Sequence, residues 1–315
     1  MQVLTKADIA AVLPSIDLMA QIEPGFVAYS RGRSVVPPVG ELLFEDPPGE
    51  VHIKYGYLTD DGYYVIKVAS GFANNAALGL PTSNGLMLLF SQQSGELVAV
   101  LHDEGLLTDI RTAAAGAIAA KHLAPSSEAR IGIAGTGIQA RLQLEYLAPV
   151  IECREVLAWG RNPDRVAQYV IDAAALGFNV AVAADSAELL DSCQLIVATT
   201  AATEPVLAHA DGIHGVHITA VGSDTPHKQE LDAQLLRHAD LVVADSISQC
   251  IERGEIHKAL EAGTIAQSEV VELGSVIAGE VPGRTDDSQL TIADLTGVAV
   301  QDIQIAKAVF SAVTG

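Results

Sequence analysis

A glycine-rich segment at residues 131–140 has the residue types needed to bind the phosphates of a nucleotide cofactor. It reads Ile-Gly-Ile-Ala-Gly-Thr-Gly-Ile-Gln-Ala, an apolar strand that leads into Gly135-x-Gly137-x-x-Ala140 and then a helix. The glycines permit a tight turn and close approach of a pyrophosphate, Ala140 allows helix–strand packing, and the helix N-terminus offers amides. Strand, turn and helix in this order predict a dinucleotide site rather than a chance Gly-rich turn, with Ile138 and Gln139 lining it.

The residues after the next expected strand bear on the choice of cofactor. A NAD site usually has an acid here that binds the ribose hydroxyls, but this chain reads Trp159-Gly160-Arg161-Asn162. Arg161 could pair with a 2′-phosphate, or it could stack on adenine or lie in solvent. The sequence favours NADP(H) over NAD(H), with Arg161 and Asn162 among the cofactor-binding residues.

Arg111 is the first candidate for binding an anionic substrate. It falls in the first turn of a helix expected over 108–123, where the helix dipole disfavours a cation, so an anion should compensate it. One alternative is pairing with Asp103 or Asp109. The other is that Arg111 and the free amides bind a carboxylate or a phosphate.

Two lysines interrupt expected strands, Lys54 in His52–Tyr57 and Lys67 in Tyr63–Ser70. A strand lysine most often lies on a solvent face or guards an edge. From the pattern alone, a solvent-facing or edge position is favoured for Lys54. For Lys67 it is almost as strongly favoured as a functional role.

Asp224 follows an expected strand at His217–Val221, at the carboxyl edge where doubly wound sheets carry their ligands. It could also be a turn residue or the N-cap of the next helix. His214 and His217 have metal-like spacing, but no third ligand is in register, so we predict no metal site.

The elements that must position these residues fall into two groups. Residues 51–103 show strand patterns separated by Gly, Pro, Asn and Asp turns, which predict a mainly antiparallel sheet. From residue 130 onward strands alternate with helical patterns, which predicts a parallel sheet. The expected fold class is α/β, a Rossmann-type doubly wound parallel sheet plus an α+β substrate-binding and dimerisation domain. We place the latter at 1–124 and the Rossmann domain at 125–291, with Pro125–Glu128 as linker and a helical tail, 292–315, packing back on the first domain.

Bulk composition narrows the class further. A length of 315 residues fits two domains, and a net charge of −21 disfavours nucleic acid and anionic membrane surfaces as partners. The cysteines are odd in number and form no CxxC pair, and the N-terminus has no basic-then-apolar signal. No apolar run is long enough to span a bilayer, so we expect a cytoplasmic protein.

Several segments together resemble the ornithine cyclodeaminase/mu-crystallin family, in order along nearly the whole chain. They are Gly79–Gly85, Leu107–Ala114, Gly135–Ala140, Thr203-Glu204-Pro205 and Gly222-Ser-Asp224-Thr-Pro-His-Lys228-Gln-Glu-Leu231. Within the family the chain looks closest to a branch labelled as ectoine-utilization proteins, especially in 256–263 and 291–297.

The resemblance implies roles for particular residues. The family's matching Lys and Arg, here Lys67 and Arg111, hold the substrate carboxylate, Thr82 lies near the nicotinamide, and Asp224 handles protons at the amine. It also implies a homodimer through the first domain's sheet. We add Thr199 and Ser223 to the cofactor-binding residues.

One departure from the family pattern bears on the substrate. Cyclodeaminases have Pro-x-Arg in the early strand region, whereas this chain has Val39 where that Arg would stand. Ornithine is therefore disfavoured as the substrate. The resemblance implies hydride transfer at the α-carbon of an amino acid or cyclic imine, by a cyclodeaminase, an amino-acid dehydrogenase or an imine reductase. A catalytically silent small-ligand binder, like mu-crystallin, is a further alternative.

Overall fold

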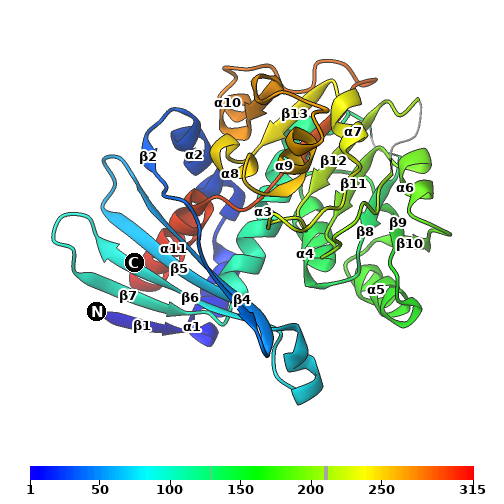
Figure 1. The fold of residues 1–315 in the computed structure, drawn as a ribbon. Helices are drawn as coiled ribbons and strands as arrows, with labels where there is room; N and C mark the ends of the chain where they lie inside the picture. Colours follow the sequence, from blue (N-terminus) through cyan, green and yellow to red (C-terminus); the bar gives the residue numbers. More distant parts are fainter. Residues whose placement is uncertain (128, 209–211) are drawn as a thin grey trace. The chain divides into compact units, whose positions relative to one another are not determined.

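The chain forms two compact units in a computed structural model that describes residues 1–127, 129–208 and 212–315 (Figure 1). The first unit comprises Met1–Arg111 and Val298–Gly315, and the second comprises Thr112–Gly297. Glu128, at the end of the expected linker, lies outside the described residues. The domain boundaries expected from the sequence stay a prediction. They place 1–124 with 292–315 in one domain and 125–291 in the other.

A mixed sheet dominates the first unit. Its order is β1-β7-β6-β5-β4-β2, with β3 also paired to β4, and all its pairs are antiparallel except β1 with β7. The strands are β1 (Gln2–Thr5), β2 (Ser34–Val35), β3 (Gly40–Glu45), β4 (Pro48–Leu58), β5 (Tyr63–Gly71), β6 (Ser83–Ser91) and β7 (Leu97–His102).

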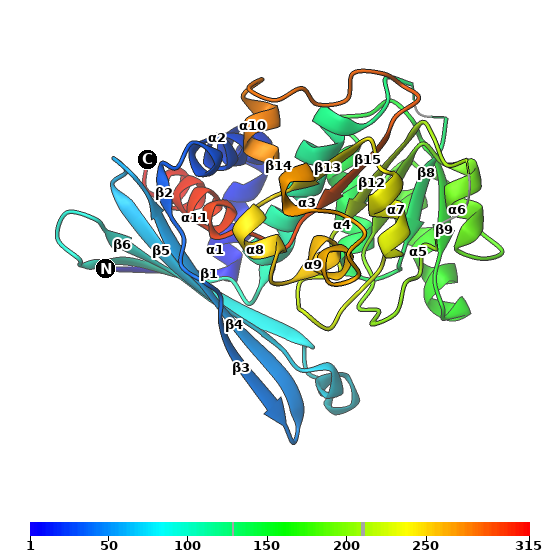
Figure 2. The same ribbon diagram turned by 45° about the horizontal axis from the view of Figure 1, so that its top comes forward.

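Helices cover one face of this sheet (Figure 2). They are α1 (Lys6–Val12), α2 (Leu18–Ser30) and α11 (Ala299–Thr314), and α11 contacts α2, β4, β5 and β6. The N-terminus of α1 is fixed by a capping box, in which the Thr5 side chain accepts from the Asp8 amide and Asp8 accepts from the Thr5 amide. Buried Ile9, Ile22 and Phe26 anchor these helices to the core of the unit.

The second unit is built on an all-parallel sheet, which confirms the α/β Rossmann-type class. Its order is β10-β9-β8-β11-β12-β15-β13-β14. The strands are β8 (Ile131–Ala134), β9 (Glu155–Trp159), β10 (Asn179–Val182), β11 (Leu195–Ala198), β12 (Val216–Ala220), β13 (Leu241–Ala244), β14 (Val270–Glu272) and β15 (Leu290–Asp294). The helices are α3 (Leu106–Leu123), which begins in the first unit, α4 (Ile138–Leu147), α5 (Pro163–Ala175), α6 (Ala187–Ser192), α7 (Ala233–His238), α8 (Ile247–Cys250), α9 (Gly254–Glu261) and α10 (Leu273–Ile277).

The prediction of a helical tail over 292–315 is wrong for its first residues. Residues Leu290–Asp294 form β15, which lies between β12 and β13 in the parallel sheet, and helix α11 begins only at Ala299. All five residues of β15 are buried, because a central strand of a parallel sheet is covered on both faces. Such a strand reads as a short apolar run, which periodicity does not distinguish from a buried helix.

Two further findings concern membrane-spanning helices and metal sites. No helix in the described part of the chain is both long and apolar enough to cross a membrane. Over the same residues, no group of three or more His, Cys, Asp or Glu side chains is arranged to hold a metal ion. His217 instead lies within β12, where its ring contacts the hydroxyls of Thr219 and Thr291.

Candidate active site

The glycine-rich turn after β8 has the geometry of a pyrophosphate loop. Gly135 has a positive φ of 118°, and a Cβ there would lie 2.5 Å from the Thr199 Oγ1 atom, so no side chain fits. Above Gly137 there is open space, which leaves its backbone accessible to a ligand. Helix α4 starts at the next residue without a side-chain cap, so its first amides point toward that opening. These residues fit a bound dinucleotide.

The loop lies at the point where the strand order of the sheet reverses. Strand β8 pairs with β9 on one side and with β11 on the other. Ligands of open α/β sheets bind beyond the carboxyl ends of strands at such a point. Thr199, which follows β11, donates its hydroxyl to the Ala134 carbonyl at 3.1 Å, so the loops after β8 and β11 are held together.

Two candidate cofactor-binding residues, Arg161 and Asn162, follow β9. Arg161 is exposed to solvent. The side-chain oxygen of Asn162 accepts from the amides of Asp164 and Arg165 at 3.0 and 3.1 Å, which caps α5. Asn162 therefore starts helix α5, while the side chain of Arg161 is open to solvent.

Three charged side chains of the first unit meet in its interior. Asp302 on α11 lies 3.3 Å from the Lys67 ammonium and 3.1 Å from the Arg111 guanidinium, measured from oxygen to nitrogen. All three are buried, with exposed fractions of 2% for Lys67, 5% for Arg111 and 0% for Asp302. Gln301 adds an acceptor for Arg111 at 3.0 Å.

A second lysine lies beside this cluster. In the antiparallel register of β4 and β5, buried Lys54 stands directly opposite Lys67. Burial, and then the charges of Arg111 and Lys54, lower the pKa of Lys67 to about 7, against the opposing effect of Asp302. Asp103 is the other buried carboxyl nearby, and burial raises its pKa. Lys67 thus lies between Asp302, which favours its charged form, and two basic groups, which oppose it.

The two Asp302 oxygens form no hydrogen bonds of good geometry with the described residues, although both are buried. The ion pairs are therefore Coulombic contacts that leave donor directions of Lys67 and Arg111 unused by Asp302. A substrate carboxylate is the kind of group that would take those donors.

Two expectations about this region are corrected. Helix α3 begins at Leu106, so Arg111 lies in its second turn, and its ion-pair partner is Asp302 rather than Asp103 or Asp109. Asp103 instead accepts from the Leu107 amide at 2.7 Å, at the start of the helix.

Lys54 is also corrected. It is 6% exposed, not on a solvent face, because β4 is an inner strand of the sheet and α11 packs on it.

Sequence reasoning missed Asp302 and Gln301, although the chain contains a signal for them. They interrupt the apolar run of Val298-Ala-Val-Gln301-Asp302-Ile303, and every residue of this run is buried. A polar pair inside an apolar helix has to find partners in the core, so it points to a buried network.

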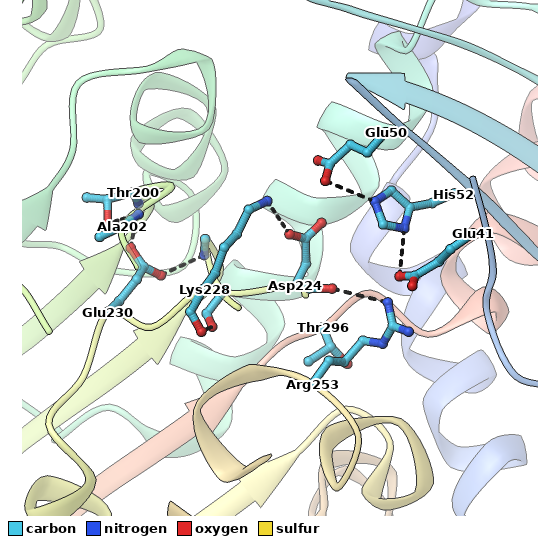
Figure 3. Close-up of polar contacts among 12 residues, drawn as sticks. Glu41, Glu50, His52, Thr200, Ala202, Asp224, Lys228, Glu230, Arg253 and Thr296 are labelled. Atoms are coloured by element: carbon cyan, nitrogen blue, oxygen red, sulfur yellow. Dashed lines mark hydrogen bonds and ion pairs between the residues drawn. The ribbon is translucent and has the colours of Figure 1, made fainter. Parts of the chain in front are cut away.

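Asp224 lies in the second unit, in the loop that follows β12 (Figure 3). Its Oδ1 accepts from the Lys228 ammonium at 2.7 Å, and its backbone carbonyl accepts from Arg253 at 3.4 Å. The Ser223 hydroxyl donates to the Lys228 carbonyl at 2.8 Å and closes the same loop. Asp224 is half-buried and does not cap a helix, since α7 is capped by Asp232.

Thr82, the remaining expected site residue, belongs to the first unit and immediately precedes β6. It is exposed, and its carbonyl accepts from the Phe72 amide at 2.8 Å. Within the first unit, the structure brings Lys67 and Arg111 together. Within the second, it brings together the loops that contain Gly135 and Thr199.

A parallel sheet with a glycine loop at its switch point defines a dinucleotide-binding enzyme of Rossmann type. The family model for the ornithine cyclodeaminase/mu-crystallin family matches residues 1–315, and the chain belongs to that family. It is a nicotinamide-dependent enzyme of amino-acid and imine chemistry, as the resemblance implied.

Solved structures similar to this chain include dehydrogenases and reductases. An archaeal alanine dehydrogenase dimer with bound NAD has 34% identity and a TM-score of 0.89, with 98% of this chain and 95% of that chain covered. The iminosuccinate reductase of Paracoccus denitrificans with NAD⁺ has 31% identity, a TM-score of 0.90 and the same coverage. The Thermococcus litoralis Δ¹-pyrroline-2-carboxylate reductase with NADH and L-proline has 26% identity and a TM-score of 0.91, covering 99% and 97%.

Proposed function

We propose that this protein is an amino-acid dehydrogenase or imine reductase that interconverts a small α-amino acid and the corresponding α-imino acid. The observation that carries the proposal is the buried cluster in which Lys67 and Arg111 share one carboxylate, Asp302, beside Lys54. Every substrate in this class has an α-carboxylate, which is the kind of group that Lys and Arg side chains bind. Relatives with dehydrogenase and reductase activities support the reaction class.

The proposed roles follow from the chemistry of each side chain. Lys67 and Arg111 hold the substrate carboxylate, and Lys54 supplies the positive charge that the absent family arginine at Val39 would give. Asp224, with the Lys228 ammonium at 2.7 Å, exchanges a proton with the substrate nitrogen as it changes between imine and amine. When bound, the nicotinamide gives or takes the hydride at the α-carbon.

The cofactor would be held by the loops beyond β8, β9, β11 and β12. The Gly135–Gly137 backbone and the first amides of α4, at Ile138, Gln139 and Ala140, would hold the pyrophosphate. Thr199 and Ser223 would line the nicotinamide half. Arg161 supports a preference for NADP(H), because its exposed guanidinium follows β9 where an acid would select NAD(H). The similar structures with a bound cofactor contain NAD⁺, NAD or NADH, which supports the opposite preference.

Cyclodeamination is the second candidate, favoured by membership of the family. In that reaction a side-chain amine attacks the imine, ammonia leaves and the hydride returns, so no net redox change remains. A mu-crystallin-like binder would bind the cofactor without turnover. Retention of Lys67, Arg111 and Asp224 together argues for an active enzyme.

A substrate panel separates these candidates. The protein is incubated with NADH or NADPH and pyruvate plus ammonium, oxaloacetate plus ammonium, or Δ¹-pyrroline-2-carboxylate, and in parallel with NAD⁺ or NADP⁺ and amino acids including ornithine. Net change in the absorbance of the reduced cofactor supports a dehydrogenase or reductase. Ammonia release from ornithine without net cofactor change identifies a cyclodeaminase, and cofactor binding with neither identifies a binder. The ectoine-utilization-like branch, suggested by 256–263 and 291–297, would gain support only from a substrate outside this panel.

We also propose a homodimer formed through the sheet of the first unit. Strand β3 exposes Leu42, Leu43 and Phe44 by 53%, 66% and 44%, which is unusual for consecutive large apolar residues on a monomer surface. The archaeal alanine dehydrogenase, which covers 98% of this chain, is a dimer. Light scattering at micromolar concentration should return twice the 32.8 kDa chain mass, and a monomer mass would refute the dimer. Replacing Leu43 with Glu should shift the mass toward the monomer.

A further inference from the structure

One buried glutamate of the second unit, Glu230, joins the loops that follow β11 and β12. Its Oε1 accepts from the Thr200 amide, and its Oε2 accepts from the Gly222 amide at 2.7 Å. Glu230 is 0% exposed. Figure 3 shows its carboxylate between the two backbone segments, on the opposite side of Lys228 from Asp224.

The two loops touch directly where Glu230 clamps them. A Cβ on Gly222 would lie 2.0 Å from the Thr200 carbonyl oxygen and 2.8 Å from the Glu230 carboxyl carbon. Only glycine permits that approach, so the start of the Asp224 loop is packed against the turn at Thr200. Gln229 strengthens the same junction, because its amide donates to the Ala202 carbonyl at 2.8 Å.

The backbone of Glu230 is bound by the side chain of a second buried glutamate. Glu255, in the first turn of α9, accepts from the Glu230 amide at 2.7 Å and from the Leu231 amide at 3.0 Å. The carbonyl of Glu230 accepts from the amides of Val206 and Leu207 at 2.8 and 2.9 Å. The backbone of Glu230 is therefore fixed, and its side chain transmits that position to both loops.

The chemistry of the clamp requires two acceptor oxygens. Both carboxylate oxygens receive a backbone N–H, whereas a glutamine would offer one oxygen and turn an N–H₂ group toward the other amide. Burial and then Glu255 raise the pKa of Glu230 to about 8, whereas the Thr200 and Gly222 amides favour its ionised form.

We propose that Glu230 is a positioning residue that sets the place of Asp224 by locking the Gly222 end of its loop to the Thr200 turn. Asp224 lies two residues beyond Gly222, and the Lys228 ammonium that it binds is two residues before Glu230. The Thr200 turn is in turn tied through Thr199 to Ala134, the last residue before the glycine-rich loop. The inference rests on the proposed role of Asp224 in proton transfer.

The test compares Glu230→Gln and Glu230→Asp with the exposed control Glu252→Gln. Hydrogen exchange with mass spectrometry follows peptides covering 199–204 and 221–229, with 155–159 as a reference strand. In Glu230→Gln the first two segments should exchange faster while the reference is unchanged, because one amide loses its acceptor. Glu230→Asp keeps the charge but is too short to reach both amides, so it should show the same pattern and carries the test if Glu230→Gln does not fold.

The kinetic arm uses whichever panel substrate turns over, with NADH or NADPH as the cofactor. A misplaced proton-transfer group should lower kcat by about 10- to 100-fold in the Glu230 variants, with KM and the cofactor dissociation constant changed little. Faster exchange with normal kcat would overturn the positioning role, and so would unchanged exchange. If the wild-type protein turns over no panel substrate, the proposed function fails by itself, whereas the exchange data still decide whether Glu230 locks the loops.

Discussion

The two units differ in the kind of polar group that each places at its candidate site. In the first unit, full charges on strand β5 and helices α3 and α11 are buried around Asp302. In the second, the glycine-rich loop offers uncharged backbone amides at an open turn, and Asp224 lies half-buried in a loop. In the proposed function, the buried charges of the first unit hold the substrate carboxylate and the backbone amides of the second unit hold the cofactor. The two regions should therefore respond to substitution in different ways.

The largest expected effect is on turnover, at Asp224. Replacement by Asn keeps the shape but removes the group that exchanges a proton, so kcat should fall by roughly 10²–10⁴-fold. Cofactor affinity should change little, because the pyrophosphate is held elsewhere. The exposed Asp191→Asn variant is the control, and near wild-type turnover in Asp224→Asn would remove Asp224 from the mechanism.

Substitution in the buried cluster should act on binding first. Arg111→Ala removes one charge-assisted contact to the substrate carboxylate and leaves Asp302 with Lys67 alone. The substrate KM should rise by about 10- to 100-fold, since such a contact contributes about 1.5–3 kcal/mol. The matched control is Arg33→Ala, which removes an exposed arginine of the same unit. A fall in kcat with an unchanged KM would assign Arg111 to chemistry instead of binding.

The pKa of Lys67 gives this cluster a pH dependence. Its folded-state value of about 7 lies below the ordinary 10.5, so the ammonium is present below pH 7 and is lost as the pH rises. Substrate KM should therefore increase above about pH 7, where the free protein loses the ammonium, and level off at the higher pKa that the bound carboxylate gives Lys67. In Lys67→Arg, which stays charged, the slope of log KM between pH 7 and 9 should disappear. The same slope in both proteins would mean that another group titrates.

The smallest effect is expected at Arg161, which tests whether the loop region also uses a full charge. Arg161→Ala should weaken NADPH binding by several-fold, with NADH little affected, because only NADPH has a 2′-phosphate. Cofactor fluorescence titration measures both, with the exposed Arg237→Ala as control. Tighter binding of NADH than of NADPH by the wild-type protein would contradict the preference read from the sequence.

Sequence patterns predicted the fold and the cofactor loop because both depend on local rules. Gly135 and Gly137 predict a turn, and the alternation of strand and helix patterns predicts a parallel sheet. The missed parts depend on long-range contacts. Strand β15 is recognisable only once its neighbours β12 and β13 are known.

The same reasoning applies to the charged cluster. Lys54 looked like a surface residue because its burial comes from helix α11, about 250 residues further along the chain. Asp302 has no motif around it, and its role emerges only when Lys67 and Arg111 are placed beside it. Glu230 lies inside a family-like segment, yet its two amide partners, Thr200 and Gly222, come from different loops.

Isotope transfer tests the central claim most directly. The protein is incubated with reduced cofactor carrying deuterium at both C4 positions and with pyruvate plus ammonium or Δ¹-pyrroline-2-carboxylate, and the amino-acid product is examined by mass spectrometry and proton NMR. Hydride transfer at the α-carbon predicts one deuterium on Cα of alanine or proline, formed in step with cofactor oxidation. An amino acid formed without deuterium at Cα, or no product although the cofactor binds, would contradict the account.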